Sequence, residues 1–213
     1  MTTLEAPRPA EILNGRNPSI MVFDCDWTLY PYDCDKECIA PFQRRPHGIV
    51  DRWGRWADPY PDVPHILGAI VDAGIPVAFL SRNPSAGPLE QLLRTLPMVS
   101  SKIPGGCFWD AMRGPECFHA YSNSGNTFTK GKDRHFAALM AATGIHTNQM
   151  LFFDDMPDNI KAAAAQGTTS ILLGKSGLTW AAFAAGITGW RERMKKIEAA
   201  EGAREAQAQN GAA

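Results

Sequence analysis

Three short apolar segments, each ending at a polar residue, constrain the fold of this chain more than any other feature. They are Ile20 to Phe23 before Asp24, Val77 to Leu80 before Ser81, and Met150 to Phe153 before Asp154. Unbroken apolar runs of this length are typical of parallel strands that are buried on both faces. Segments with helical spacing follow them, at 61–74, 132–143 and 157–166. This alternation predicts right-handed crossovers and an α/β fold, a doubly wound parallel sheet.

Weaker patterns predict the remaining elements. Further strands are expected at 117–121 and 168–173, and a further helix at 88–96. Residues 31–61 are rich in proline, tryptophan, tyrosine and charge, without a clear period. We expect an irregular excursion there, with a short β flap. Long loops of this kind in compact domains tend to be functional or disordered, and the aromatic residues favour a function.

Three parts of the chain are expected from its length and local composition. The 213 residues suit one α/β domain with some excess. Residues 1–17 are polar and contain Pro7 and Pro9, so we expect a loose N-terminal arm at 1–18, and residues 19–190 form the α/β domain. Residues 191–213 consist mainly of Ala, Glu, Gln and Lys, which predicts a solvated or disordered tail.

The charge balance and the hydropathy pattern exclude several classes of protein. Basic and acidic residues number 21 and 22, so nothing indicates a partner that is a nucleic acid or a membrane surface. No apolar run approaches the roughly 20 residues that cross a bilayer. Residues 1–17 lack the apolar segment of a secretory signal. We therefore expect a cytoplasmic protein.

The cysteines support a reducing compartment. There are five of them, without a CxxC pair, and an odd number without a secretory signal disfavours a disulfide framework. Cys34 and Cys38 would hold zinc only if other ligands converged on them, because tetrahedral zinc takes four ligands.

Acidic residues follow the strands that lie together in a doubly wound sheet. The carboxyl ends of parallel strands meet at one edge, where ligands bind. Four carboxylates are expected there with the Ser81 hydroxyl and a lysine: Asp24, Asp26, Asp154 and Asp155. Such a group repels itself unless a cation neutralises it. Oxygen ligands suit Mg²⁺, which takes one or two carboxylates together with waters and phosphate oxygens.

The motifs around these residues resemble those of the haloacid-dehalogenase (HAD) superfamily. Residues 24–28 read DCDWT and match its DxDxT signature, and Ser81, Lys132 and Asp154–Asp155 follow in the order of its other three motifs. The chain is most similar to the eukaryotic magnesium-dependent phosphatases of the acid-phosphatase-like family. The stretches that carry this similarity are 23–31, 60–64, 80–82, 131–136 and 152–155, and the resemblance covers roughly residues 19–185.

The resemblance implies a fold and an activity. The fold is a Rossmann-like HAD domain without a large cap domain, because 33–60 and 85–132 are too short for one. The activity is Mg²⁺-dependent hydrolysis of phosphate monoesters through an aspartyl-phosphate. Asp24 would be the nucleophile and Asp26 the general acid and base.

The same resemblance implies the binding residues. The Asp24 side chain, the Asp26 backbone carbonyl and Asp155 would hold Mg²⁺, with Asp154 close by or bound through water. Ser81 would donate a hydrogen bond to the phosphate, and Lys132 would neutralise the phosphate and the nucleophile. Lys130 also flanks Gly131, but the spacing to His135 favours Lys132. Arg82 is expected to contact the phosphate as well, although an exposed turn explains it equally.

The substrate and the role of the aromatic residues stay open at this point. The aromatic residues of the first loop either pack in the core or form a rim above the phosphate site: Trp27, Tyr30, Tyr32, Trp53 and Trp56. The substrate is either phosphotyrosine in a phosphoprotein, which would make the chain a protein tyrosine phosphatase, or a small sugar phosphate. Residues 100–126 depart from the family pattern in length. A non-catalytic phosphate-binding module with a HAD fold is the alternative, which the intact Asp24 and Asp26 disfavour.

Overall fold

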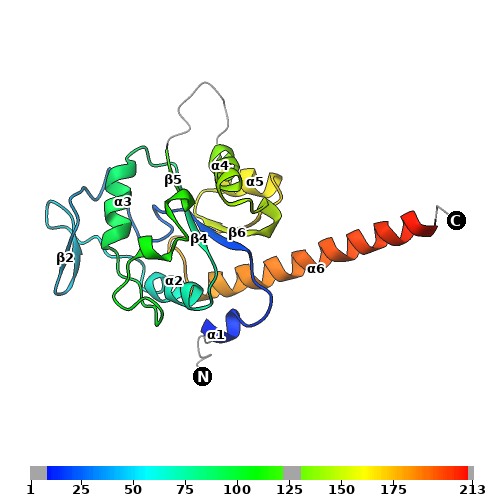
Figure 1. Ribbon diagram of the computed structural model, residues 1–213. Helices are drawn as coiled ribbons and strands as arrows, with labels where there is room; N and C mark the ends of the chain where they lie inside the picture. Colours follow the sequence, from blue (N-terminus) through cyan, green and yellow to red (C-terminus); the bar gives the residue numbers. More distant parts are fainter. Residues whose placement is uncertain (1–8, 122–130, 211–213) are drawn as a thin grey trace.

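The computed structural model describes residues 9–121 and 131–210, with a five-stranded sheet at the centre (Figure 1). Its strand order is β5–β4–β1–β6–β7, and every pair is parallel. The strands are β1 (Ile20–Phe23), β4 (Val77–Ser81), β5 (Phe118–Ala120), β6 (Met150–Asp154) and β7 (Thr169–Leu172). The chain runs outward from β1 to β5 and then returns to β6 on the other side of β1. The predicted doubly wound α/β fold is confirmed.

Helices cover both faces of the sheet. They are α1 (Pro9–Ile12), α2 (Val63–Asp72), α3 (Ala86–Thr95), α4 (Asp133–Thr143), α5 (Pro157–Ala165) and α6 (Trp180–Asn210). In Figure 1, α4 and α5 lie above the sheet, whereas α2 and α6 lie below it. Short 3-10 turns occupy η1 (Phe108–Ala111), η2 (Pro115–Cys117) and η3 (Thr147–Gln149). None of the helices in the described ranges has the length and apolar character that crossing a membrane requires.

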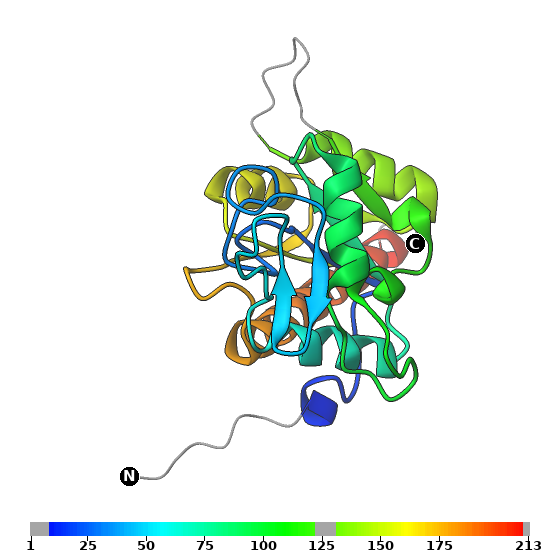
Figure 2. The same cartoon turned by 90° about the vertical axis from the view of Figure 1, so that its left-hand side faces the viewer.

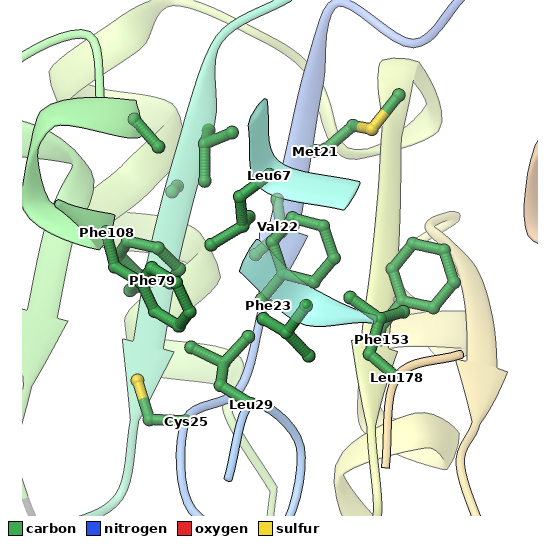
Figure 3. Close-up of a cluster of buried hydrophobic side chains, with 14 of the residues drawn as sticks. Met21, Val22, Phe23, Cys25, Leu29, Leu67, Phe79, Phe108, Phe153 and Leu178 are labelled. Atoms are coloured by element: carbon green, nitrogen blue, oxygen red, sulfur yellow. The ribbon is translucent and has the colours of Figure 1, made fainter. Parts of the chain in front are cut away.

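Aromatic packing holds the central strands in place. All four residues of β1 are fully buried. The ring of Phe23 stacks on that of Phe153 in β6, with centroids 5.3 Å apart, and lies 6.5 Å from that of Phe79 in β4 (Figure 3). Close packing of this kind leaves side chains in single rotamers. The strand ends, and the polar residues that follow them, are therefore held firmly.

The predicted short flap is present after β1. Strands β2 (Gln43–Arg45) and β3 (Gly48–Val50) form an antiparallel hairpin, and we call residues 41–57 the flap. The buried Asp51 carboxylate organises its base. It accepts hydrogen bonds from the backbone N–H groups of Ile39, Trp53 and Arg55 and from the Arg55 guanidinium at 2.6 and 2.8 Å. Burial alone would raise the pKa of Asp51, but these donors lower it to about 2.

Replacing Asp51 by asparagine is expected to destabilise the flap. The amide loses the charge-assisted bonds to Arg55 and cannot accept every backbone donor, so the variant should lose roughly 1–3 kcal/mol of unfolding free energy at pH 7. Because the pKa of Asp51 is lowered on folding, its contribution is complete above the unfolded value of 3.8 and is lost as the pH falls through about 2. The stability difference between the two proteins, measured by denaturant titration, should therefore shrink as the pH falls from 3.8 to about 2. A difference that does not change with pH would contradict this account.

Two of the predicted domain limits fall inside packed structure. Helix α6 runs without a break across residue 190, and both Trp190 and Met194 are buried. Arg191 donates hydrogen bonds to the backbone carbonyls of Asn14 and Arg16, which ties α6 to the segment before β1. Ile12 and Leu13 of the expected loose arm are also buried. The expected arm is therefore anchored at Ile12 and Leu13, and the expected tail begins as a continuation of α6.

Candidate active site

The polar residues that follow the central strands converge at the carboxyl edge of the sheet. Asp24 follows β1, while Ser81 and Asp154 end β4 and β6 on either side of it. A hollow of about 230 Å³ lies at this edge. Its lining includes most of the predicted site residues: Asp24, Asp26, Ser81, Arg82 and Asp155. The loop after β1 and the flap face the viewer in Figure 2, on the side where this edge lies.

A larger hollow of about 440 Å³ lies elsewhere, between the N-terminal segment and α2. Leu13, Ala69 and Val99 contribute to its mainly apolar lining. Its one carboxylate, Asp72, already accepts hydrogen bonds from Ser100, Ser101 and Lys102. Among the described residues its other titratable side chain is that of His65, whereas the smaller hollow gathers several carboxylates, so the smaller one is the candidate site.

A buried lysine joins the carboxylates of two strands. The ammonium group of Lys132 forms ion pairs with Asp24 and, at 2.6 Å, with Asp154, and all three side chains are buried. Burial alone would lower the pKa of Lys132, but the two carboxylates raise it, so this lysine stays protonated. Burial raises the pKa of Asp24, although Lys132 opposes this effect, and the nearby Asp154 and Asp26 raise it further. The single positive charge of Lys132 therefore does not offset the effect of burial on the pKa of Asp24.

The acidic cluster fits a small divalent cation. Asp24, Asp154 and Asp155 each offer an oxygen atom, and these atoms lie within 4.8 Å of one another. Burial and the neighbouring Asp154 raise the pKa of Asp155. A hard cation with oxygen ligands relieves that repulsion, and Mg²⁺ is bound in this way by carboxylates, waters and phosphate oxygens. Among the described residues, this is the only group of His, Cys, Asp and Glu side chains with converging ligand atoms, so Cys34 and Cys38 form no such site.

The partners of the two adjacent aspartates differ. Asp154 accepts hydrogen bonds from the Met156 N–H at 2.7 Å and from the Asn159 amide at 2.9 and 3.0 Å, in addition to its pair with Lys132. Both of its oxygen atoms are therefore engaged. Asp155 is only half-buried and lines the hollow, so it is the more accessible ligand.

Asp26 is held by three donors from different segments. Its Oδ1 accepts hydrogen bonds from the Tyr30 hydroxyl at 2.8 Å and the Cys34 N–H at 3.2 Å, and its Oδ2 accepts one from the Asn83 amide at 3.1 Å. Burial raises the pKa of Asp26 to about 6, against the lowering effect of these hydrogen bonds. A carboxyl group with such a pKa exchanges protons near neutral pH, which suits a general acid and base.

The remaining predicted residues line the other side of the hollow. Ser81 is buried, and its hydroxyl accepts a hydrogen bond from the Asn83 N–H at 3.1 Å. Arg82 is exposed at the mouth. His135 contacts the Ser81 carbonyl at 2.8 Å through Nε2, and burial lowers its pKa to about 4. A neutral histidine in this place positions the end of β4 and is not part of the acidic cluster.

Some aromatic residues of the first loop are buried in the core, and others are exposed. Tyr30 and Tyr32 are buried and stacked, with ring centroids 4.5 Å apart. Trp27 is 40% exposed, lines the hollow and has a positive φ of 59°, which is unusual for a residue with a side chain. Trp53 and Trp56 are exposed on the flap. Tyr30 and Tyr32 therefore pack in the core, Trp27 lies at the rim of the hollow, and Trp53 and Trp56 are outside its lining.

The sequence prediction overlooked the groups that orient the carboxylates. The sequence places Tyr30 only in the aromatic group and gives no indication of a role for Asn159. The available signal for Tyr30 was its position four residues after Asp26 in a tight turn, where Asp26 and Tyr30 form an isolated bridge. Lys130 and residues 122–126 of the divergent segment lie outside the described residues.

The chain is similar to several known proteins. A family model described as acid phosphatase matches residues 16–193. The human magnesium-dependent phosphatase 1 is 32% identical over 158 residues, which cover 74% of this chain and 78% of that protein. A HAD-like hydrolase superfamily protein of Schizosaccharomyces pombe is 27% identical over 153 residues, covering 70% of this chain and 81% of its own. A solved structure of a hypothetical protein from Xanthomonas campestris has a TM-score of 0.45 at 15% identity, over 92% of this chain and 94% of that one.

Proposed function

The chain belongs to the acid phosphatase family, and from that premise we propose that it hydrolyses phosphate monoesters through an aspartyl-phosphate on Asp24. It is a HAD-type phosphoric monoester hydrolase with Mg²⁺ as its cofactor. The observation that supports the covalent step most is the burial of Asp24 beside Lys132 and Asp154, at the end of a fully buried strand. A carboxylate fixed in this way attacks with little loss of orientational freedom.

The first half-reaction follows from the two aspartates. A carboxylate oxygen of Asp24 attacks phosphorus, and the bond from phosphorus to the leaving oxygen breaks. Asp26 gives its proton to that oxygen, which departs as an alcohol or phenol. Lys132 neutralises Asp24 before the attack and the phosphoryl oxygens during it. Ser81 and Arg82 are proposed to donate hydrogen bonds to the same oxygens.

The second half-reaction regenerates the enzyme. Asp26 takes a proton from a water molecule, which attacks phosphorus, and the bond between phosphorus and Asp24 breaks to release inorganic phosphate. We assign Asp24, Asp155 and the Asp26 carbonyl as ligands of Mg²⁺, with Asp154 nearby. When bound, Mg²⁺ would supply positive charge for the phosphoryl oxygens and orient the ester for in-line displacement. Tyr30 and Asn83 keep Asp26 in its place throughout.

We propose a phosphorylated protein side chain, with phosphotyrosine as the preferred group, as the substrate. The hollow opens at the surface, and the exposed indole of Trp27 at its mouth offers a flat face to an aromatic ring. A small sugar phosphate is the competing substrate. We infer a cytoplasmic location, since all five cysteines are free and four of them are buried.

Turnover of a substrate panel tests this proposal. The purified chain, with Mg²⁺, should hydrolyse p-nitrophenyl phosphate and a phosphotyrosine peptide, with a higher kcat/KM for the peptide than for any sugar phosphate. A higher kcat/KM for a sugar phosphate would reverse the choice of substrate. Phosphate binding without turnover of any ester would favour a non-catalytic binding module.

Replacing Asp26 by asparagine is expected to slow turnover by roughly a hundredfold or more, which is the usual effect of a positioned proton donor. The amide oxygen of asparagine can still accept the hydrogen bonds from Tyr30 and the Cys34 N–H, whereas its amino group cannot accept the one from Asn83. An unfolding midpoint therefore checks that the variant is folded. The loss should be smaller for p-nitrophenyl phosphate than for an alkyl phosphate, because a good leaving group needs little protonation. Steady-state kinetics on a series of esters measures this difference. Equal losses on all esters would show that Asp26 has a structural role only.

A further inference from the structure

The flap carries exposed cations and indoles that the proposed reaction does not use. Residues 41–57 contain four arginines and one aspartate, a net charge of +3, whereas the whole chain has a net charge of −1 and the rest of it therefore −4. Trp53 and Trp56 are 70% and 58% exposed. Tryptophan and arginine are the residues that contribute most often to binding energy at protein interfaces. The flap therefore combines a net charge opposite to that of the rest of the chain with apolar side-chain area that is exposed to solvent.

Strand register places several of these side chains together. Gln43 pairs with Val50, and Val50 forms a bridge with Trp56, so these three side chains project from one face of the ribbon. Arg45, two residues after Gln43, projects from the same face. Ile49 points the other way and is buried. The loop that follows β3 adds Arg52 and Trp53. We call Arg45, Arg52, Trp53 and Trp56 the flap surface.

The charges of the flap surface are available to a partner. Arg55 is already paired with Asp51, but in the described ranges neither Arg45 nor Arg52 forms a salt bridge. Arg45 donates a hydrogen bond to the Gln43 side chain, and the guanidinium of Arg52 lies 5.3 Å from the centre of the Trp53 ring. Guanidinium groups bind carboxylates in a bidentate fashion, which makes an acidic ligand the natural complement.

The flap surface lies beside the mouth of the candidate site. Asp35 and Lys36 line the hollow, and two residues later the Cys38 thiol donates to the Trp56 carbonyl at 3.7 Å. Two residues span at most about 7 Å, so the backbone of Trp56 lies within roughly 10 Å of the Lys36 backbone at the mouth. In Figure 2 the hairpin and the loop after β1 face the same side. A ligand bound to the flap can therefore also reach the hollow.

We propose that the flap surface docks an acidic segment of a phosphoprotein substrate while the phosphorylated side chain occupies the hollow. This inference rests on the proposed phosphatase function and narrows its substrate class. Arg45 and Arg52 pair with carboxylates of the segment, and Trp53 and Trp56 cover its backbone and apolar side chains. Extended peptide rises about 3.3 Å per residue, so the acidic residues lie about three to five positions from the phosphorylated one.

Charge around the flap favours a short acidic peptide over a nucleic acid. Asp33 and Asp35 line the mouth beside it, and the chain outside the flap is negative. A nucleic acid is a continuous polyanion that needs an extended basic surface. It would meet these carboxylates as soon as it left the flap. An acidic peptide segment carries its charge over only a few residues.

A peptide pair tests the docking. One phosphotyrosine peptide carries three glutamates at positions three to five from the phosphotyrosine, and its partner carries glutamines there. The variant with Arg45→Glu and Arg52→Glu reverses both charges at exposed positions. The matched control, Lys195→Glu with Lys196→Glu, makes the same change on the exposed part of α6, which extends away from the flap (Figure 1). Turnover of p-nitrophenyl phosphate by each protein serves as the reference, and an unfolding midpoint shows that each is folded.

The wild type should favour the glutamate peptide about tenfold in kcat/KM, mainly through KM, and added salt should reduce this preference. The flap variant should lose the preference relative to the reference substrate, and the α6 control should keep it. Equal kcat/KM for both peptides in the wild type, or an equal loss in the control, would overturn the proposal. If p-nitrophenyl phosphate is not hydrolysed either, the phosphatase function has failed. The fluorescence anisotropy of a dye-labelled glutamate peptide, which should bind the wild type more tightly than the flap variant, then tests docking separately. Tighter binding of a single-stranded oligonucleotide than of this peptide would also overturn the docking proposal.

Discussion

Replacing Asp24 by asparagine is expected to abolish hydrolysis while leaving the fold intact. An amide attacks phosphorus poorly, and a single nucleophile substitution of this kind removes about three or more orders of magnitude of rate. The variant also loses one oxygen ligand with full negative charge, so its affinity for Mg²⁺ should fall. Steady-state kinetics and a Mg²⁺ titration measure the two effects separately.

The buried lysine decides whether the Asp24 variant folds. Removing one partner from a buried ion pair costs several kcal/mol when the other charge is left alone, about 3–5 in measured cases. Lys132 keeps Asp154 as a partner at 2.6 Å, and the carbonyl oxygen of the substituted amide would still accept a hydrogen bond from it. We therefore expect an unfolding midpoint within a few degrees of the wild type. The matched control is Asp158→Asn, an exposed aspartate in the first turn of α5, which should change neither rate nor midpoint appreciably.

A phosphate mimic distinguishes the covalent role of Asp24 from a purely metal-binding one. Beryllium fluoride with Mg²⁺ should bind at the Asp24 carboxylate of the wild type and fail to bind the asparagine variant. Substantial turnover by the variant would mean that water attacks the ester directly. Such a result would overturn the covalent mechanism and leave the phosphatase function standing.

The central sheet could be predicted from the sequence because strands that are buried on both faces consist of unbroken runs of apolar residues. The apolar runs of β1, β4 and β6 end at or just before a polar residue. The sequence therefore predicts both where these strands end and that their polar residues share one edge of the sheet. The helix predicted at 88–96 begins two residues earlier, at Ala86, since Pro88 is tolerated in the first turn. Strand β5 has only partly buried residues and a weaker pattern, and its prediction was correspondingly less well defined.

The contacts that hold Asp26 could not be predicted in the same way. Asn83 reaches Asp26 across a separation of 57 residues, and nothing in the local sequence encodes that distance. Arg82 and Asn83 belong to the same turn, and the sequence does not show which of them is buried. In the structure Asn83 is buried and Arg82 is exposed. The length of α6 could not be predicted either, because an Ala- and Glu-rich segment is typical of both a solvated helix and a disordered tail. Trp190 and Met194 anchor its first half to the domain.

Removing the divalent cation is expected to abolish turnover and to lower stability. Asp24, Asp154 and Asp155 offer three carboxylates to a site in which Lys132 supplies one positive charge, and the substrate brings a further negative group. Burial raises the pKa of both Asp24 and Asp155, so without a cation the nucleophile holds a proton more readily and cannot attack.

Chelation should therefore stop hydrolysis, and Mg²⁺ should restore it, whereas Ca²⁺ should restore it poorly because it prefers more ligands and a looser geometry. Since a ligand that binds only the folded state stabilises it, the unfolding midpoint should rise with Mg²⁺ concentration, and a hundredfold excess over the dissociation constant would add about 2.7 kcal/mol. Asp155→Asn should shift both the kinetic and the thermal titration to higher Mg²⁺ concentrations in parallel, because the same side chain serves both. The control Asp158→Asn should shift neither. Full activity in a chelator would contradict the metal assignment, and a shift in the thermal titration alone would mean that the ion stabilises the acidic cluster without taking part in the reaction.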